Sequence, residues 1–314
     1  MEDTADKGGR LVRSRAAVTV VAERAEQTLG PMVRAITVEQ QEWSAGGGMH
    51  LAGIWRATET PILIKLGVNA NQLYWTQQMA ATAPDLVPVL YASGEKLGDL
   101  SFGWTVMERI AFGPLGPAWN GDEFEMLLEA AVRFQRATRT VEPQQTATLD
   151  ITLFRHWLQV GLSTAPPGPV EIVLDRLERD WAWVVDTCAF EICHGDVHMC
   201  NVLTRTPPPQ RSDALLIDSQ PIRQPWAFDA AYPQILNSID RSRVGYQELV
   251  PKMARIRAAY GMLSCDEHDL AALERITLAW FAIRLWGLTP ERHSITDYRD
   301  ETERYITESA VLAL

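Results

Sequence analysis

The alternation of apolar and polar residues divides the chain into a strand-rich first third and a helical remainder. Short runs of β-branched and aromatic residues, separated by turn residues, predict five strands. We expect these strands at 35–43, 49–57, 62–66, 87–92 and 102–107. After the third strand, the segment 69–82 predicts a helix that ends before Pro84.

Beyond this sheet the chain has the periodicity of helices. Apolar residues recur at intervals of three and four, the pattern of one buried helix face. The pattern predicts helices at 124–135, 151–162, 170–185 and 267–288. An irregular segment, 190–218, precedes the last of these. It contains two apolar runs joined by a proline-rich stretch, 204–213, which favours a hairpin with an exposed tip.

The change from strands to helices falls near a Gly- and Pro-rich segment at 111–117. We therefore expect an α+β fold with a flexible tail at 1–15, a small sheet-rich lobe at 16–110 and a larger helical lobe at 111–314. The tail lacks the apolar stretch of a secretory signal, and no apolar run reaches the ~18 residues of a membrane helix. These features predict a cytoplasmic protein that does not enter a membrane.

The net charge of the chain indicates which kinds of molecule the protein could bind. The 314 residues carry a formal net charge of −11, which argues against binding to nucleic acid phosphates. An acidic surface is compatible with a cationic small molecule, but it also serves solubility. The four cysteines, in a chain without a signal segment, predict reduced thiols rather than disulfides.

The densest signal for chemistry is HGDVHMCN at 194–201, followed by LLID at 215–218. A carboxylate and an amide five residues apart, Asp196 and Asn201, can converge on one site from an irregular loop. The hairpin expected after them would bring Asp218 close to Asn201. Phosphoryl transfer needs oxygen ligands for Mg²⁺ on nucleotide phosphates and a carboxylate that accepts a hydroxyl proton, and these three side chains meet that need.

This pattern resembles the H-G-D-x-H-x-x-N loop and the following I-D segment of the aminoglycoside phosphotransferases. That family shares a bilobal, protein-kinase-like fold with choline kinases and protein kinases. The resemblance implies Asp196 as the catalytic base, with His194 bracing the loop and His198 as a further residue of the catalytic motif. It also implies Asn201 and Asp218 as magnesium ligands.

The same resemblance implies a reaction. Asp229, in WAFD at 226–229, matches an aspartate that buttresses the catalytic loop of the family, and 217–232 most closely resembles the streptomycin-kinase-like branch. The implied reaction moves the γ-phosphoryl group of ATP or GTP to a small-molecule hydroxyl, in a cleft between two lobes. An aminoglycoside or related antibiotic is the favoured acceptor, with antibiotic resistance as the role. Choline, homoserine and sugars are the alternatives.

Candidate nucleotide contacts lie in the first third. Lys65 lies within the apolar run PILIKL, where an unpaired ammonium is costly to bury. The resemblance implies that it contacts the α- and β-phosphates, whereas an edge-strand lysine reaching water is the structural alternative. Gly47 and Gly48 fall where the family has its phosphate-covering loop. Glu108 and Ile110 resemble the hinge whose backbone binds adenine.

One departure from the family pattern leaves a second function open. The fold usually supplies a glutamate on the helix after the strand lysine, but there is no acidic residue between Lys65 and Asp85. The chain could therefore bind a nucleotide without turning it over. Protein-kinase activity is not expected, because the sequence has no H-R-D, D-F-G or A-P-E element.

A zinc site is a third interpretation of the same segment, with Cys193, His194, His198 and Cys200 as ligands. The spacing is poor, because adjacent residues of a strand point in opposite directions. Zinc would also leave Asp196 without a role.

The sequence gives the weakest indication for the residues that would bind the acceptor molecule. Seven carboxylates of the helical region could hold a cationic substrate, although most are typical of solvated helix faces: Asp240, Glu248, Asp266, Glu267, Asp269, Asp297 and Asp300. Trp280, Arg284 and Trp286 fall on one helix, where core packing is favoured over stacking on a ligand.

Overall fold

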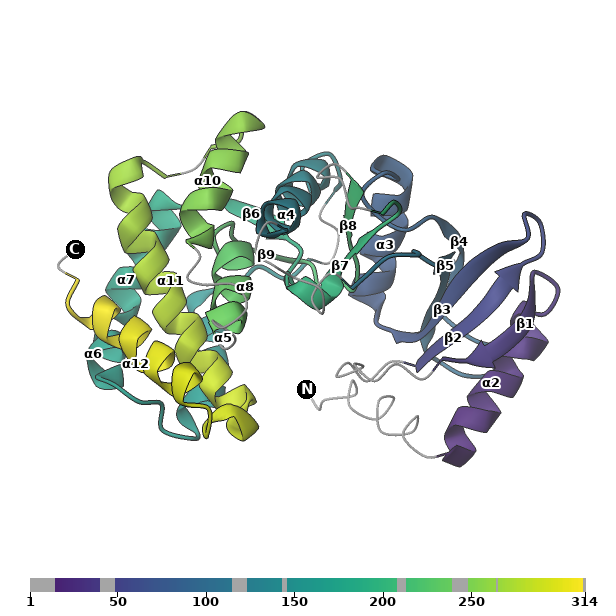
Figure 1. Ribbon diagram of the computed structural model, residues 1–314, viewed down its shortest axis with the longest axis horizontal. Coiled ribbons are helices and arrows are strands. Elements are labelled where there is room, and N and C mark those ends of the chain that lie inside the picture. Colours follow the sequence, from purple (N-terminus) through teal and green to yellow (C-terminus); the bar gives the residue numbers. More distant parts are fainter. Residues whose placement is uncertain are drawn as a thin grey trace. The chain divides into compact units, whose positions relative to one another are not determined.

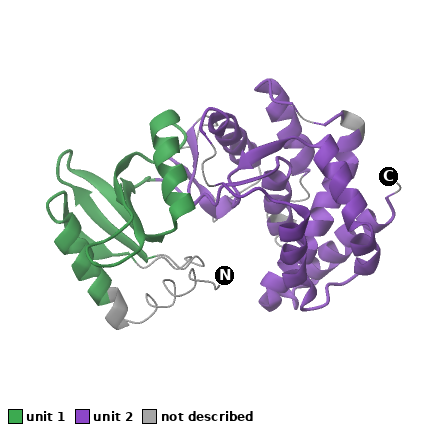
Figure 2. Cartoon of the chain, turned by 180° about the vertical axis from the view of Figure 1, so that it is seen from behind, with its two compact units in different colours: residues 1–111 green, residues 112–314 purple. Residues whose placement is uncertain are grey.

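The computed structural model describes residues 15–39, 49–114, 123–142, 146–207, 213–238, 248–263 and 265–312. The chain forms two compact units, Met1–Ala111 and Phe112–Leu314 (Figure 2). The tail expected at 1–15 lies outside the described residues, except that the first helix begins at Arg15. None of the described helices is long and apolar enough to cross a bilayer.

Unit 1 is built on an antiparallel sheet with the strand order β1-β2-β3-β5-β4 (Figure 1). The strands are β1 (Val33–Val38), β2 (Met49–Trp55), β3 (Thr60–Val68), β4 (Leu90–Gly94) and β5 (Gly103–Glu108). Helix α3 (Ala70–Thr82) follows the third strand. The five strands and the helix between the third and fourth confirm the expectation from the sequence.

Helix α2 (Arg15–Leu29) was not predicted, because its first half is rich in β-branched residues, which favour strands. Its buried residues Val21, Ala25 and Leu29 are spaced by four and join the apolar core of the sheet. The first strand also begins earlier than expected, at Val33. The register with β2 shifts between Arg34 and Thr37, and this irregularity obscures the alternation of side chains.

Unit 2 consists mainly of helices, with two small antiparallel sheets (Figure 1). Its helices are α4 (Phe124–Thr138), α5 (Ile151–Leu162), α6 (Val170–Asp175), α7 (Leu177–Thr187), α8 (Phe228–Ser238), α10 (Leu249–Ala259), α11 (Glu267–Leu288) and α12 (Thr296–Ala310). Strand β6 (Phe190–Cys193) pairs with β9 (Ile222–Pro225), and β7 (Val202–Thr204) pairs with β8 (Ala214–Leu216). Short 3₁₀ segments, η2 (Met199–Asn201) and η4 (Pro290–Arg292), connect other elements.

The single helix expected at 170–185 is two helices, α6 and α7, which meet at Arg176. The guanidinium of Arg176 donates a hydrogen bond to the carbonyl oxygen of Ser309 on α12, at 2.9 Å. This contact joins segments that are far apart in the chain. Local periodicity cannot reveal it.

Helices α5 and α11 cross at two glycines. A Cβ atom on Gly161 would lie 1.8 Å from the carbonyl oxygen of Ile283, and one on Gly287 would lie 2.0 Å from that of Val160. Such distances are impossible for real side chains, so both positions require glycine. The two backbones therefore approach one another as closely as helix packing allows.

Candidate active site

The polar loop predicted from the sequence occupies the turn between the two small sheets of unit 2. It leaves β6 after Cys193 and enters η2 and then β7. The antiparallel pairing of β7 with β8 continues to the backbone N–H of Ile217, which donates to the carbonyl oxygen of Asn201 at 3.0 Å. Asp218 follows directly, with a left-handed backbone (φ 59°). The hairpin therefore brings Asn201 and Asp218 to the same end of the two strands.

Asp229 holds the start of this loop. Its carboxylate is buried on α8, where Oδ2 accepts hydrogen bonds from the backbone N–H of His194 (3.0 Å) and from Nε2 of Gln135 (3.0 Å). Oδ1 accepts from the backbone N–H of Gly195 at 3.2 Å. Burial raises the pKa of Asp229 to about 6, although these donors favour its ionised form. The contacts agree with the buttressing role that the resemblance implied.

Gly195 allows the loop to turn beside the segment before β9. Its φ of +80° lies in the left-handed region, and a Cβ atom would lie 2.1 Å from the carbonyl oxygen of Gln220. The backbone N–H of Gln220 donates in return to the carbonyl oxygen of His194 at 2.8 Å. Only glycine fits both the conformation and the contact, so the position of the next residue, Asp196, is fixed by the backbone.

The carboxylate of Asp196 is held on both sides. Nδ2 of Asn201 donates to Oδ2 of Asp196 and to its backbone carbonyl, each at 3.0 Å. Nε2 of His198 lies 3.6 Å from Oδ1. Burial alone would raise the pKa of Asp196, but His198 lowers it below its usual value. The side chain is still 31% exposed, so an ionised carboxylate in a fixed orientation is open to a small molecule.

His198 is a neighbour of the carboxylate rather than an isolated base. Burial is the largest single influence and lowers its pKa, but the polar contacts acting together, chiefly with the carboxylate of Asp196, raise the pKa to about 9. The backbone N–H of Cys200 points at Nδ1 from 3.2 Å, so a proton on Nδ1 would break this hydrogen bond and oppose the rise. In either state Nε2 carries the proton that faces Asp196.

His194 braces the loop through its backbone and through packing. Its ring is fully buried and meets the ring of Phe134 edge-on, with centroids 5.3 Å apart. Burial lowers the pKa of His194 to about 4, although the charges of Asp196 and Asp218 act in the opposite direction. These charges show that the ring lies near both carboxylates.

This buried ring makes stability depend on pH. Between pH 6.5 and 4 the unfolded chain protonates His194 and the folded chain does not, so stability is lost as pH falls. We expect the free energy of unfolding of the wild type, relative to His194→Leu, to fall by about 3 kcal/mol between pH 7 and pH 4. Chemical denaturation at both pH values measures it. Asp229 titrates in both proteins, so its contribution cancels in the comparison. If the difference in unfolding free energy between the two proteins were the same at pH 7 and pH 4, water would reach the ring of His194.

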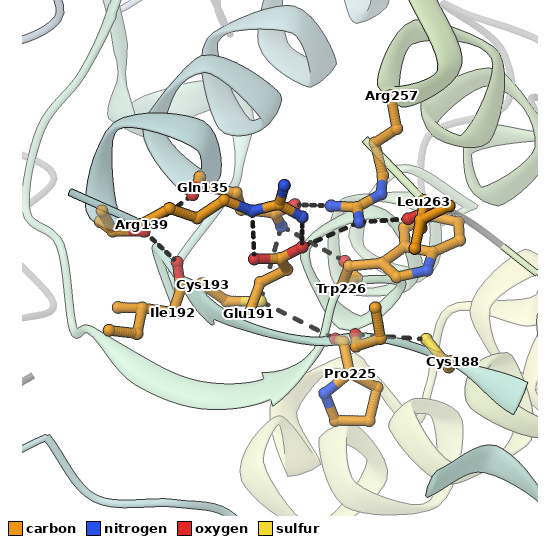
Figure 3. Close-up of polar contacts among 12 residues, drawn as sticks. Gln135, Arg139, Cys188, Glu191, Ile192, Cys193, Pro225, Trp226, Arg257 and Leu263 are labelled. Atoms are coloured by element: carbon orange, nitrogen blue, oxygen red, sulfur yellow. Dashed lines mark hydrogen bonds and ion pairs between the residues drawn. The ribbon is translucent and has the colours of Figure 1, made fainter. Parts of the chain in front are cut away.

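A buried polar network joins α4, β6 and α10 (Figure 3). Arg257 of α10 is fully buried, and it donates to Oε1 of Gln135 (2.6 Å) and to Oε1 of Glu191 (3.0 Å). Glu191 of β6 also accepts hydrogen bonds from Arg139. Because Gln135 donates to Asp229, which binds the backbone of His194 and Gly195, the network runs from α10 to the 194–201 loop without interruption.

The zinc interpretation does not fit this geometry. Cys193 is fully buried, with its thiol directed at the backbone carbonyls of Gln224 (3.7 Å) and Pro225 (3.8 Å). Burial raises the pKa of Cys193, whereas zinc binds the thiolate. In the part of the chain that the structure describes, no group of three or more His, Cys, Asp or Glu side chains could hold a metal by itself.

The predicted nucleotide contacts belong to unit 1. Lys65 lies at the centre of the sheet, paired with His50 on β2 and Thr105 on β5. It is half-buried, on the opposite face of β3 from the core residues Ile64 and Leu66. Gly47 and Gly48 lie outside the described residues.

Two backbone N–H groups of the predicted hinge already form hydrogen bonds within unit 1. The backbone N–H of Glu108 donates to Val89, and that of Arg109 donates to Pro61. The side chain of Glu108 accepts from the N–H of Val89 at 3.1 Å. These N–H groups therefore hold the end of β5, and Ile110 follows as the next backbone donor.

The helix after the strand lysine uses its first amides for capping. Asn69 accepts from the backbone N–H of Gln72 at 2.8 Å, and the side chain of Gln72 accepts in return from the N–H of Asn69. Gln77 donates to Ser93 of β4 at 3.0 Å. The side chains of Asn69, Gln72 and Gln77 therefore form hydrogen bonds with groups other than Lys65.

Sequence reasoning missed Tyr232 and Trp157, and it favoured core packing for Arg284; the three residues come from three different helices. Tyr232 of α8 lies next to Asp196, and burial together with this carboxylate raises the pKa of the phenol. The guanidinium of Arg284, from α11, lies over the ring of Trp157 on α5, 3.9 Å from its centroid. Trp280, on the same helix, packs in the core as expected. No motif marks Tyr232 or Trp157, which follow ordinary helix periodicity.

The sequence matches no protein-family model and no curated protein. The structure does resemble solved structures. Aminoglycoside phosphotransferase APH(4)-Ia has a TM-score of 0.58 and 13% identity over 95% of this chain and 100% of that one. A thermostable mutant of this enzyme, in ternary complex with AMP-PNP and hygromycin B, has a TM-score of 0.57 and 13% identity. The match covers 93% of this chain and 99% of that chain.

Plasmodium vivax ethanolamine kinase Pv091845 has a TM-score of 0.56 and 12% identity over 99% of this chain and 95% of that chain. At these identities the likeness concerns the fold. The coverage is nearly complete on both sides, so it includes the sheet of unit 1 and the helices of unit 2. The chain therefore has the α+β, kinase-like fold that aminoglycoside phosphotransferases and ethanolamine kinases share.

Proposed function

We propose that the protein is a magnesium-dependent phosphotransferase that moves the γ-phosphoryl group of ATP to a hydroxyl group of a small molecule. The observation that carries this proposal is the fixed, ionised and accessible carboxylate of Asp196, held by Asn201. It lies on a loop that Asp229 fastens by two backbone hydrogen bonds. A base in this setting meets the requirement of phosphoryl transfer for a positioned proton acceptor.

In the proposed reaction the acceptor hydroxyl lies against Asp196 and gives its proton to the carboxylate. A bond forms between the hydroxyl oxygen and the γ-phosphorus, and the bond from that phosphorus to the β–γ bridging oxygen breaks. ADP leaves with the electron pair of that bond, and the acceptor becomes a phosphate ester. The low pKa of Asp196 keeps it ionised before the reaction.

The residues beside Asp196 fit a magnesium ion. The amide nitrogen of Asn201 donates twice to Asp196, and this orientation turns its oxygen away from that carboxylate. Asp218 supplies a second oxygen donor at the same end of the hairpin. Magnesium prefers oxygen ligands and keeps several from water and phosphate, so two protein ligands suffice. When bound, it offsets negative charge on the β- and γ-phosphates.

For the nucleotide we propose Lys65 at the α- and β-phosphates and the backbone near Glu108 and Ile110 at the adenine. Gly47 and Gly48 would cover the phosphates. ATP is the proposed donor because a structural neighbour binds AMP-PNP. The absence of an acidic residue from 66 to 84 makes nucleotide binding without turnover the alternative outcome.

For the acceptor, the neighbours suggest two chemical classes. One neighbour holds hygromycin B, and another is an ethanolamine kinase. The resemblance of the catalytic loop favours an aminoglycoside, which would make the protein a factor in antibiotic resistance. Both classes carry amines, and the experiment below includes uncharged and anionic alcohols as well.

We expect ADP release from Mg²⁺ and ATP to increase when the correct acceptor is added. A coupled assay would screen aminoglycosides, amino alcohols, sugars, sugar acids and alcohol phosphates, with mass spectrometry to detect the phosphate ester. Chelation of the metal should abolish turnover. Nucleotide binding by calorimetry without stimulation by any acceptor would favour the binding-only alternative, and absence of nucleotide binding would contradict the proposed function.

A further inference from the structure

Arg284 is held in an unusual position for a charged side chain. Its guanidinium stacks on the indole of Trp157, in the geometry of a cation–π contact. The glycine crossing of α5 and α11 explains this contact, because Trp157 lies four residues before Gly161 and Arg284 three residues before Gly287. Trp157 lies about one helical turn from the crossing, and Arg284 lies at the crossing, because a Cβ atom on Gly161 would be 2.9 Å from the Cα atom of Arg284. The backbone therefore fixes where the guanidinium lies.

The guanidinium of Arg284 has no partner of opposite charge in contact. Among the residues that the structure describes, it makes no hydrogen bond and no ion pair. Burial lowers its pKa, and the charges of Tyr232 and Asp196 act in the opposite direction. The contrast is Arg257, which is buried with Glu191 and Gln135 at hydrogen-bond distance. Arg284 is only half-buried, so its donors remain open to a ligand that offers acceptor oxygens.

A chain of aromatic contacts links Arg284 to the catalytic loop. The ring of Tyr232 meets the ring of His198 edge-on at 6.3 Å and lies 5.7 Å from the ring of Phe281. Phe281 lies one turn before Arg284 on α11. This side of Asp196 therefore presents a guanidinium, and Arg292 adds a second positive charge near Tyr232.

Glu248, one of the carboxylates that the sequence offered for a cationic substrate, lies outside the 194–201 loop. Glu248 lines a cavity of about 570 Å³ together with Glu274, Arg275 and Glu308. Arg304 also lines it and binds Glu308 at 2.8 Å, so the cavity carries both charges. None of its lining residues belongs to the catalytic loop.

The other candidate carboxylates give no better support for a cation site. Asp297 and Asp300 are exposed on α12. Asp240 and the side chain of Glu267 lie outside the described residues.

We propose that Arg284, supported by Trp157, binds an anionic group on the acceptor, a carboxylate or a phosphate, while a hydroxyl of the same molecule faces Asp196. This inference rests on the proposed function and assigns the acceptor a charge opposite to that of aminoglycosides and amino alcohols. A planar guanidinium can form two parallel hydrogen bonds with either anion. The anionic group takes no part in bond making or breaking.

The first test compares acceptors that differ in charge. One series is 3-amino-1,2-propanediol, glycerol and glycerol 3-phosphate, and another is glucosamine, glucose and glucuronate. We expect the anionic member to have the highest kcat/KM. Arg284→Gln should raise the KM of that member about 10- to 100-fold, with the KM of ATP unchanged, and Arg284→Lys should restore part of the loss.

Arg275→Gln is the matched control, because it makes the same change nine residues earlier on α11, on the opposite face of the helix. Its side chain is exposed, and its kinetics should equal those of the wild type. An equal fall in kcat for every acceptor, without a change in acceptor KM, would overturn the proposal, because Arg284 would then act on the transferred phosphoryl group.

A second test needs no turnover. Acetate and inorganic phosphate, at ionic strength matched with chloride, should raise the thermal midpoint of the wild type and Arg275→Gln more than that of Arg284→Gln. Equal shifts in all three proteins would overturn the inference. Arg284-dependent anion binding without any turnover would contradict only the proposed function. Phosphorylation of an aminoglycoside, equally by wild type and Arg284→Gln, would contradict only this inference.

Discussion

Asp196→Asn should lower kcat for phosphoryl transfer by about 10²- to 10⁴-fold, the usual contribution of a general base. The substitution keeps the size and shape of the side chain and its hydrogen bond with Nδ2 of Asn201. The KM of ATP should therefore change little, because the loop and its attachment to Asp229 remain. Steady-state kinetics on the best acceptor from the screen measures both constants.

Asp297→Asn is the control for this experiment, because it removes one exposed carboxylate of the same unit from the surface of α12. A second readout is the titration of His198, whose pKa of about 9 depends on Asp196 and should fall in Asp196→Asn. A fall in the pKa of His198 with kcat unchanged would show that the carboxylate is present as described but is not the base.

Arg257→Met should destabilise the protein by about 3–5 kcal/mol, because breaking a buried ion pair leaves the other charge uncompensated. Glu191 is buried and would keep only Arg139, whose side chain is 43% exposed. Gln135 would also lose the donor to its Oε1. Urea unfolding at neutral pH, followed by fluorescence and circular dichroism, measures the loss.

Arg155→Met is the matched control for the ion pair. Arg155 pairs with Glu178 at the surface, where both side chains are well exposed. Such pairs contribute about 0–1 kcal/mol. Equal losses in the two variants would mean that Arg257 is not buried with its partners. The double variant Arg257→Met/Glu191→Leu should recover part of the stability, because it removes the uncompensated carboxylate as well.

Local pattern predicted most of the fold. Strands β2 and β3 alternate between more and less buried residues, and α5 and α11 have the bounds that periodicity predicted. Helix α2 was missed because Val18, Thr19, Val20 and Val21 are β-branched and favour strands, although the later spacing of buried residues is helical. Tertiary packing overrides such local preference.

Some residues of the candidate site could be predicted from local sequence, and others could not. Asp196, Asn201 and Asp218 could be named from spacing, because one loop and one hairpin bring them together. Gln135 and Arg257 could not, because they come from separate helices and look like ordinary members of amphipathic patterns. Their importance arises from pairing in three dimensions, and a single sequence does not record which distant residues pair.

The glycine crossing has a consequence for altering this protein by selection or design. Gly161 and Gly287 lie at the crossing of α5 and α11, and the distance between these helices sets where Trp157 holds the guanidinium of Arg284. Any larger residue at either position would force α5 and α11 apart and would displace the stacked pair together with the core. In the proposed mode of acceptor binding, recognition and stability are therefore coupled at these two positions. Libraries aimed at a new acceptor should hold both glycines constant and vary the residues around them.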